Sequence, residues 1–314
     1  MSAEPLSICV LGGTGFVGTV LINRLARDGH WVRVPTRSRS HGESLRVLPT
    51  VELIEANIHD PGTLDRLVTD MDAVINLVGI LNEHGRTTFQ LAHAELAEKL
   101  VAALRAARVR RLLQMSALGA TAQGPSRYLR SKAAAEAHIR AATQLEFTIF
   151  RPSVIFGPGD SLTNRFASLL RLSGGFLPLA RAQARFAPVY VADVADAFVR
   201  ALGSRASAGQ TYELGGPEVM TLEQIVRLTA RAAALPCRIL RLPDALGRLQ
   251  AALLGLLPGR PLTLDNFRSL TVDSVCTEDG FGRLGLTPRR MEEILPGYLS
   301  PPLTPGGFTR LGAA

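Results

Sequence analysis

The sequence contains very little lysine. Only two of its 35 basic residues, Lys99 and Lys132, are lysines, and the rest are arginines spread along 314 residues. Aromatic residues make up only 5% of the chain, and no basic run is interleaved with them, which excludes a nucleic-acid interface. The formal charge of +8 therefore leaves an acidic ligand, an anionic membrane surface or a merely solvated surface as its explanations.

Cysteine is also scarce. Cys9, Cys237 and Cys276 lie far apart, without a CxxC motif or a neighbouring histidine cluster. This spacing excludes a disulfide framework and a zinc site, so we predict reduced, mostly buried thiols and no metal.

Long apolar runs are absent as well. The N-terminus leads directly into "LSICVLGGTGF", without the basic and apolar regions of a signal peptide. No segment reaches the roughly 18 apolar residues of a spanning helix. We expect a cytoplasmic protein, with peripheral contact to the cytoplasmic face of the inner membrane left open. A hydrophobic fraction of 46% and a length of 314 residues predict a folded chain with one large domain or two intimate ones.

The first half of the chain alternates apolar strand-like runs with helical patterns. This order predicts an α/β fold, a Rossmann-type doubly wound parallel sheet with a smaller C-terminal substrate lobe. Frequent proline and glycine after Pro158 mark the change to that lobe. We expect an NAD(P)-binding domain over residues 1–155, a lobe over 156–314, and a return of the chain to the sheet at about 186–216.

Three helix boundaries follow from local signals. Asp60 and Pro61 form an N-cap and first-turn pair, which predicts a helix through Leu67. A long helix is expected from about residue 87 to 107. Thr221 and Gln224 have the spacing of a capping box.

The segment "GGTGFVG" follows the first strand and opens the first helix. Gly12, Gly15 and Gly18 have GxxGxxG spacing. Glycine allows the tight turn, the close approach of a pyrophosphate and the packing of helix on strand, while the helix N-terminus attracts the phosphates. We therefore predict that this turn holds a dinucleotide, with Thr14, Phe16 and Val17 beside the three glycines.

Residues at the ends of the second, third and fourth predicted strands indicate which dinucleotide binds and where its adenosine half lies. The second strand ends at "PTRSRS", where Arg37 stands in place of the carboxylate that would bind a ribose 2′-hydroxyl. Because arginine suits a 2′-phosphate, NADP(H) is favoured over NAD(H), although Arg37 can also be a surface residue. Two groups of residues at later strand ends are placed to contact the adenosine half: Asn57 and Ile58 after the third strand, and Leu77, Val78 and Gly79 after the fourth.

The motif "SRYLRSK" carries one of the two lysines. Tyr128 and Lys132 are four residues apart and share one helix face. A lysine beside a phenol stabilises the phenolate and lowers the pKa of the tyrosine toward the range of a general acid/base. Arginine is a poor substitute for such a compact donor, which explains a lysine here.

The glycine turn, "NLVG", "LLQMSALGA", the Tyr128/Lys132 pair and "RPSVIFGPGD" occur in an order that resembles an atypical extended short-chain dehydrogenase/reductase. The likeness is to NAD-dependent epimerase/dehydratase-like proteins, and especially to the branch that contains the complex I accessory subunit (alpha subcomplex subunit nine). The resemblance implies that Lys132 also holds the nicotinamide ribose, and that Pro152 and Val154 line the cofactor. It implies a catalytic hydroxyl after the fifth strand, for which Ser116 is the candidate because Ala117 follows.

Other positions carry weaker expectations. His93 stands where the resembled family has an asparagine on the preceding helix. By the same resemblance, Asn164 and Arg165 approach the cleft. Asp193 is interpreted as a structural, helix-capping carboxylate. The apolar helix near residues 242–259 is interpreted as lobe core, dimer contact or membrane edge.

Two functions follow. The first is an NAD(P)H-binding oxidoreductase or epimerase that uses Tyr128, Lys132 and Ser116 on a small molecule. The second is a non-catalytic NADPH-binding accessory or assembly protein linked to a respiratory or ubiquinone-related complex. The sequence selects neither a substrate nor an oligomeric state, and leaves a homodimer and membrane association open.

Overall fold

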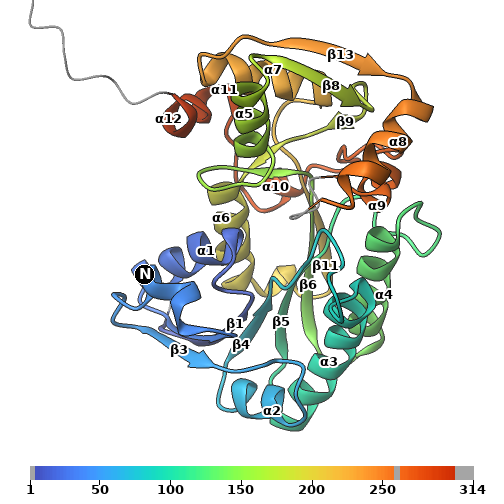
Figure 1. Ribbon diagram of the computed structural model, residues 1–314. Coiled ribbons are helices and arrows are strands. Elements are labelled where there is room, and N and C mark those ends of the chain that lie inside the picture. Colours follow the sequence, from blue (N-terminus) through green and yellow to red (C-terminus); the bar gives the residue numbers. More distant parts are fainter. Residues whose placement is uncertain (1–3, 258–261, 301–314) are drawn as a thin grey trace, which may run out of the picture.

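The computed structural model describes residues 4–257 and 262–300, and its lower half is a seven-stranded sheet (Figure 1). The strands follow the order β11-β6-β5-β4-β1-β2-β3, and all pairs are parallel. Their bounds are β1 Ser7–Leu11, β2 Trp31–Thr36, β3 Val51–Glu55, β4 Ala73–Asn76, β5 Arg111–Met115, β6 Glu146–Pro152 and β11 Gln210–Leu214. The α/β doubly wound fold expected from the sequence is confirmed.

Helices cover both faces of this sheet, because its central strands are apolar on both sides. α1 (Phe16–Arg27) and α6 (Val191–Leu202) pack together on one face, where Leu21, Leu25 and Phe198 are fully buried. α2 (Thr63–Val68), α3 (Leu96–Ala107) and α4 (Arg127–Ala141) cover the other face. The strand ends that precede α1 and α4 therefore meet at one edge of the sheet.

Two helix boundaries differ from the sequence prediction. α2 begins at Thr63, because Gly62 adopts a left-handed conformation (φ 69°) that interrupts a helix started at Asp60. The expected helix over residues 87–107 consists of a π-helical segment, Gln90–Glu95, followed by α3. The capping box of Thr221 and Gln224 is confirmed at the start of α7 (Leu222–Ala232).

The upper lobe contains short two-stranded sheets with helices around them. β8 (Phe176–Ala180) pairs with β13 (Arg238–Leu242), and α5 (Thr163–Leu172) packs on α7. The remaining elements are β7 Ile155–Phe156, β9 Arg185–Phe186, β10 Val189–Tyr190, β12 Met220–Thr221, α8 Asp244–Leu254, α9 Leu264–Ser269, α10 Gly280–Arg283, α11 Met291–Ile294 and α12 Pro296–Leu299, with short 3-10 turns at Arg39–Leu45 and Arg205–Ser207.

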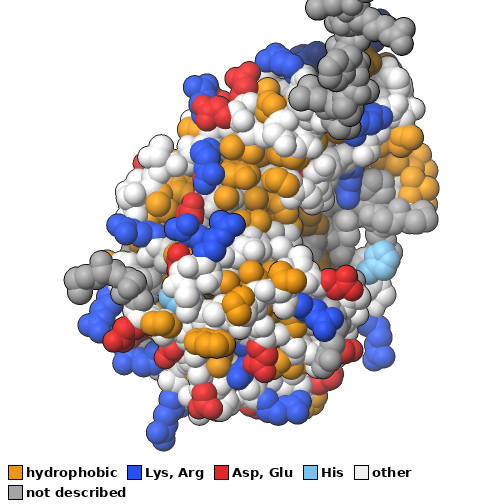
Figure 2. All heavy atoms as spheres, turned by 90° about the vertical axis from the view of Figure 1, so that its left-hand side faces the viewer, with side chains coloured by type: hydrophobic (Ala, Val, Ile, Leu, Met, Phe, Trp, Pro, Cys, Tyr) orange, Lys and Arg blue, Asp and Glu red, His pale blue; other side chains and the backbone are white. Residues whose placement is uncertain are grey.

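The late part of the chain also contributes to the lower half. β11 adds an edge strand beside β6, and α10 packs on β11, where Gly280 approaches the backbone of Glu213. Figure 2 shows the face on the α1 side of the molecule, where basic side chains lie between two areas of hydrophobic ones. Salt bridges from Arg289 to Asp193 and Asp196 join the C-terminal segment to α6. Residues late in the chain thus complete the edge of the large sheet and hold a helix on one of its faces.

Candidate functional site

The glycine turn has the shape of a dinucleotide cradle. Gly12 has φ +77°, and a Cβ on it would lie 3.1 Å from the backbone of Leu77 and of Val78. A Cβ on Gly18 would lie 2.5 Å from the carbonyl oxygens of Gly12 and Gly13, so only glycine lets α1 approach the turn this closely.

The start of α1 is open to an anion. Gly15 is exposed at the N-cap, no side chain caps the helix, and its first turn holds no acidic residue. Helix N–H groups and the helix dipole are therefore free to meet a pyrophosphate, and the turn fits the predicted cofactor. Thr14, Phe16 and Val17, beside these glycines, are half-buried along the same turn.

The strand ends that follow form the neighbouring part of this groove. Leu77 and Val78 abut Gly12, and the Val78 N–H donates to Asn76 Oδ1 at 3.1 Å. Gly79 is exposed, and a Cβ on it would lie 3.2 Å from Lys132 Nζ. The structure thus brings the predicted "NLVG" residues, the glycine turn and Lys132 together.

Side chains of both charges stand at the ends of β2 and β3, where Glu55 is the last residue of β3. Arg37 is exposed just after β2, and Ile58 is half-buried beyond β3. Asn57 is exposed, and its amide donates to Asp60 Oδ1 at 2.6 Å. Burial lowers the pKa of His59, and the charges of Lys99 and Arg37 lower it further. Arg37 and Lys99 therefore both act on the His59 imidazole, and the charges of Glu95 and Asp60 oppose their effect.

Tyr128 and Lys132 lie one turn apart on α4, as the spacing predicts. Lys132 is buried, and its Nζ donates to the carbonyl oxygens of Met115 (3.3 Å) and Val78 (3.4 Å). Tyr128 is half-buried, and its ring makes edge contacts with the rings of Phe89 and His93. The ammonium thus lies at the carboxyl ends of β4 and β5, and the phenol lies in an aromatic wall.

The expected lowering of the tyrosine pKa is wrong for this structure. Burial raises the pKa of Tyr128 to about 12. Burial lowers the pKa of Lys132 to about 8, and the Glu136 carboxylate opposes that effect. The bonds of Lys132 to two backbone carbonyls direct its ammonium toward the strand ends, so desolvation dominates both side chains.

His93 has a structural role that the sequence did not reveal. Its Nε2 accepts the Ile80 N–H at 3.1 Å, so Nδ1 carries the proton and donates to Ser131 Oγ at 2.7 Å. Ser131 in turn donates to the Tyr128 carbonyl. Burial, with a smaller effect of Lys132, lowers the pKa of His93 to about 2, so the imidazole is neutral. His93 therefore fixes the loop after β4 against the first turn of α4.

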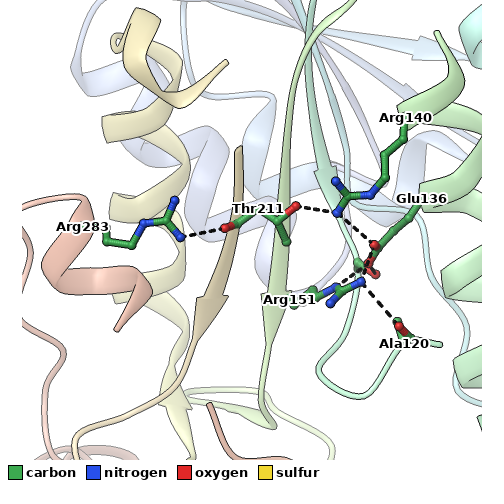
Figure 3. A network of polar contacts seen from close by, with 7 residues as sticks. Ala120, Glu136, Arg140, Arg151, Thr211 and Arg283 are labelled. Atoms are coloured by element: carbon green, nitrogen blue, oxygen red, sulfur yellow. Dashed lines mark hydrogen bonds and ion pairs between the residues drawn. The ribbon is translucent and has the colours of Figure 1, made fainter. Parts of the chain in front are cut away.

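Ser116 does not have the environment expected of a catalytic hydroxyl. Its Oγ donates to Glu136 Oε1 at 2.5 Å, and Glu136 is held by Arg151 through two bonds of 2.8 and 2.7 Å (Figure 3). Arg140 bridges Glu136 and Thr211. The buried Glu136 carboxylate accepts the hydrogen bond of the Ser116 hydroxyl, because Glu136 lies one helical turn after Lys132 on α4 and faces the end of β5. No local sequence pattern relates Ser116 to Glu136, which lies 20 residues further along the chain.

The candidate residues from β6 onward lie partly at the strand ends of the large sheet and partly in the upper lobe. Pro152 ends β6 and is buried, while Val154 is half-buried and its carbonyl accepts the Val189 N–H. Asn164 Nδ2 donates to the Asp160 carbonyl, and Arg165 is exposed on α5. Asp193 is structural as expected, but it binds the Arg289 N–H and guanidinium rather than capping its own helix.

One contributor to the site comes from far along the chain. The Asp265 carboxylate, at the start of α9, accepts the N–H groups of Arg127 (2.7 Å) and Tyr128 (3.1 Å). Asn266 Nδ2 donates to the Leu81 carbonyl at 3.0 Å. α9 thus joins the first turn of α4 to the loop after β4. Sequence reasoning missed it, because no local pattern relates residues separated by 137 positions.

Comparisons with known proteins bear on this arrangement. The model of the NAD dependent epimerase/dehydratase family matches residues 8–215. The chain is 34% identical over 309 residues to the Arabidopsis thaliana protein "NADH dehydrogenase [ubiquinone] 1 alpha subcomplex subunit 9, mitochondrial", covering 93% of this chain and 76% of the relative. It is 31% identical over 244 residues to the Caulobacter vibrioides ceramide reductase, covering 76% and 74%.

A solved structure agrees on the fold. The dTDP-glucose 4,6-dehydratase DesIV from Streptomyces venezuelae, with NAD bound, superposes with a TM-score of 0.73 at 20% identity, covering 93% of this chain and 95% of that one. Within residues 4–257 and 262–300, no helix has the length and apolar character needed to cross a membrane.

Proposed function

Because this chain belongs to the NAD dependent epimerase/dehydratase family, we propose that it is an NADP(H)-binding oxidoreductase that acts on a carbonyl or alcohol of a small molecule. Tyr128 is the proton donor and acceptor, and Lys132 is the ligand of the nicotinamide ribose. When bound, the nicotinamide supplies or accepts the hydride. The observation that carries the proposal is the position of Lys132, which reaches from α4 to the carboxyl ends of β4 and β5 beside Gly79.

The protonation states of Tyr128 and His93 are compatible with proton donation to a carbonyl oxygen. With a pKa of about 12, Tyr128 holds its proton at neutral pH, ready to donate it to a carbonyl oxygen that becomes an alcohol. The neutral His93 leaves the surrounding wall without a competing charge. Lys132 donates to backbone carbonyls, and the hydroxyls of a ribose can replace these as acceptors. Ser116 is not assigned to this step, because its hydroxyl binds Glu136.

The preference for NADP(H) belongs to the same proposal. Arg37 stands just after β2 without a carboxylate of β2 beside it, and its charge acts on His59 together with that of Lys99. A 2′-phosphate at this corner would gain charge-assisted hydrogen bonds, whereas a 2′-hydroxyl would lack an acidic acceptor at the end of β2.

A second candidate is a non-catalytic NADPH-binding accessory or assembly protein of a respiratory complex. The commitment of Ser116 to Glu136 supports it, because the tyrosine then lacks an orienting hydroxyl from that residue. The Arabidopsis thaliana relative is named as a subunit of NADH dehydrogenase [ubiquinone], whereas the Caulobacter vibrioides relative is named as a ceramide reductase. A cytoplasmic location is part of both candidates.

Replacing Tyr128 by Phe distinguishes the oxidoreductase candidate from the non-catalytic accessory candidate. NADPH oxidation is measured against a panel of carbonyl compounds, and NADPH binding is measured by calorimetry, with Tyr190→Phe in the upper lobe as a matched control. The catalytic proposal expects a loss of about 10²- to 10⁴-fold in kcat with an unchanged Kd for NADPH. Unchanged turnover in Tyr128→Phe contradicts it. Absence of turnover in the wild type, with NADPH still bound, favours the accessory candidate.

A further inference from the structure

The helix α8 turns its small residues toward the protein and its leucines toward solvent. Gly247 and Ala251 are buried, and a Cβ on Gly247 would lie 2.9 Å from the Phe267 ring of α9 and 3.0 Å from Ala180 of β8. The interpretation of this helix as lobe core thus holds for Gly247 and Ala251 but not for its leucines. The exposed leucines of α8 and of the turn after it, which we call the leucine stripe, are Leu246, Leu249, Leu253, Leu256 and Leu257, with exposed fractions from 50% to 83%. Those within α8 recur at i, i+3 and i+7, and therefore share the side of the helix opposite its buried contacts.

The paired strands β8 and β13 extend this apolar surface beside α8. Leu179 of β8 is buried with residues of α5 and α7, so alternate residues of both strands point to the other face, on which α8 packs. On that face Phe176 and Leu240 are 49% and 50% exposed. Leu240 pairs in register with Pro178, whose carbonyl accepts the Gln250 side chain of α8 at 3.0 Å. Figure 1 shows these elements at the outer edge of the upper lobe.

Unpaired positive charge accompanies the leucine stripe. Arg248 on α8, Arg238 on β13 and Arg268 on α9 are exposed, and none of the three forms an ion pair within residues 4–257 and 262–300. Arg238 is two residues before Leu240 and therefore shares its face of β13. Arginine can lay its apolar stem along such a surface while its guanidinium remains hydrated.

The acidic side chains of the same elements are already bound. β8 and β13 contain no carboxylate, and α8 and α9 contribute only Asp244 and Asp265. Asp244 forms a salt bridge with Arg181 at 2.8 Å, and Asp265 accepts two N–H groups at the start of α4. The surface therefore combines exposed leucines with an excess of positive charge.

This combination distinguishes between two occupants of the surface. A two-fold contact between copies of this chain brings the same surface of both together, so their unpaired arginines would enter one interface without an acidic partner. An anionic bilayer offers an apolar boundary to the leucines and phosphate groups to the arginines. The net charge of +8 adds a long-range attraction to such a membrane.

We propose that α8 and β13 dock on the surface of an anionic lipid bilayer. The leucine stripe, with Phe176 and Leu240, enters the boundary between headgroups and acyl chains, while Arg238 and Arg248 contact lipid phosphates. α8 lies in the plane of the membrane surface. The inference is independent of the proposed oxidoreductase function, because neither Tyr128 nor the glycine turn takes part in it.

The experiment measures co-sedimentation of the full-length chain with extruded vesicles. The vesicles contain either phosphatidylcholine alone or equal parts of phosphatidylcholine and phosphatidylglycerol. We expect the wild type to partition onto the mixed vesicles about 10- to 100-fold more strongly than onto phosphatidylcholine. The double variant Leu249→Ser/Leu253→Ser should lower the partition coefficient about 10- to 100-fold, and Arg248→Gln should lower it about fivefold on the mixed vesicles only.

Matched controls come from exposed residues of the lower half. Val47→Ser, before β3, and Arg105→Gln, on α3, should leave the partition coefficient within about twofold of the wild type, because neither residue belongs to the proposed surface. All five substituted side chains are exposed, so each variant should fold as the wild type does.

Three vesicle results overturn the proposal: a wild type that does not sediment with the mixed vesicles, equal partition onto both vesicle types, or equal partition of Leu249→Ser/Leu253→Ser and Val47→Ser. A wild-type dimer in analytical ultracentrifugation that the double leucine variant dissociates, without any vesicle binding, also overturns it and assigns the stripe to a second copy. None of these readouts involves NADPH oxidation, so failure of membrane docking leaves the oxidoreductase proposal unchanged.

Discussion

Replacing Lys132 by Met should stabilise the protein in the absence of cofactor. Lys132 is buried, and burial lowers its pKa from 10.5 to about 8. The buried ammonium therefore lowers the free energy of unfolding, because its two carbonyl contacts of 3.3 and 3.4 Å are too long to offset its desolvation. The lowering of the Lys132 pKa from 10.5 to about 8 corresponds to about 3 kcal/mol, at 1.36 kcal/mol per pKa unit. Methionine fills a similar volume without charge.

The pH dependence of stability has a definite sign. Because the folded pKa lies below the unfolded one, the unfolded chain binds more protons between pH 8 and 10.5, and the free energy of unfolding rises with pH in that window. Below pH 8 both states are protonated and the cost of burying the charge is fully present. The Lys132→Met variant should lack this part of the pH dependence.

Urea unfolding at pH 7 and at pH 9.5, without cofactor, measures both effects. Lys99→Met is the control, because Lys99 is exposed on α3 and should leave stability within about 0.5 kcal/mol of the wild type. We expect Lys132→Met to gain about 3 kcal/mol at pH 7, and to bind NADPH more weakly. A variant that is no more stable than Lys99→Met at pH 7 would refute the reasoning that the ammonium is held against its desolvation.

Further predictions concern the cofactor and the buried network. Arg37→Ala should raise the Kd of NADPH about 10- to 100-fold and leave the Kd of NADH unchanged in titrations; equal losses for both would remove the 2′-phosphate assignment. Gly18→Ala, whose Cβ would meet two carbonyl oxygens at 2.5 Å, should abolish NADPH binding, whereas Gly203→Ala, which meets nothing within 4 Å, should bind normally. Glu136→Gln should lower the free energy of unfolding by about 3 kcal/mol, against less than about 1 kcal/mol for Glu146→Gln in an exposed pair; similar losses would show that the network is not stabilising.

The sequence was informative where a local pattern determines the structure. Strand and helix alternation predicted the sheet, and the spacings of Gly12, Gly15 and Gly18 and of Tyr128 and Lys132 predicted which residues share a turn or a face. The glycine turn and the Tyr128/Lys132 pair are contacts between near neighbours, whose geometry follows from helix and strand periodicity.

The parts that sequence reasoning missed depend on distant partners. The hydroxyl of Ser116 was expected near Tyr128, but a carboxylate 20 residues later binds it. Desolvation of Tyr128 depends on which rings pack against it, and no sequence pattern showed that Phe89 and His93 would contact its ring. The pKa of the phenol was therefore predicted with the wrong sign.

The hydrogen bonds between the start of α4 and the Asp265 carboxylate also limit where the chain can be truncated. A truncated chain that ends near residue 215 would retain the glycine turn, Tyr128 and Lys132, but would leave two N–H groups at the start of α4 without their acceptor. It would also lose α10, which covers the edge strand β11. During synthesis, the half that carries the large sheet thus completes its fold only after α10 has been added, so expression fragments and fusion points belong beyond α10 rather than near residue 215.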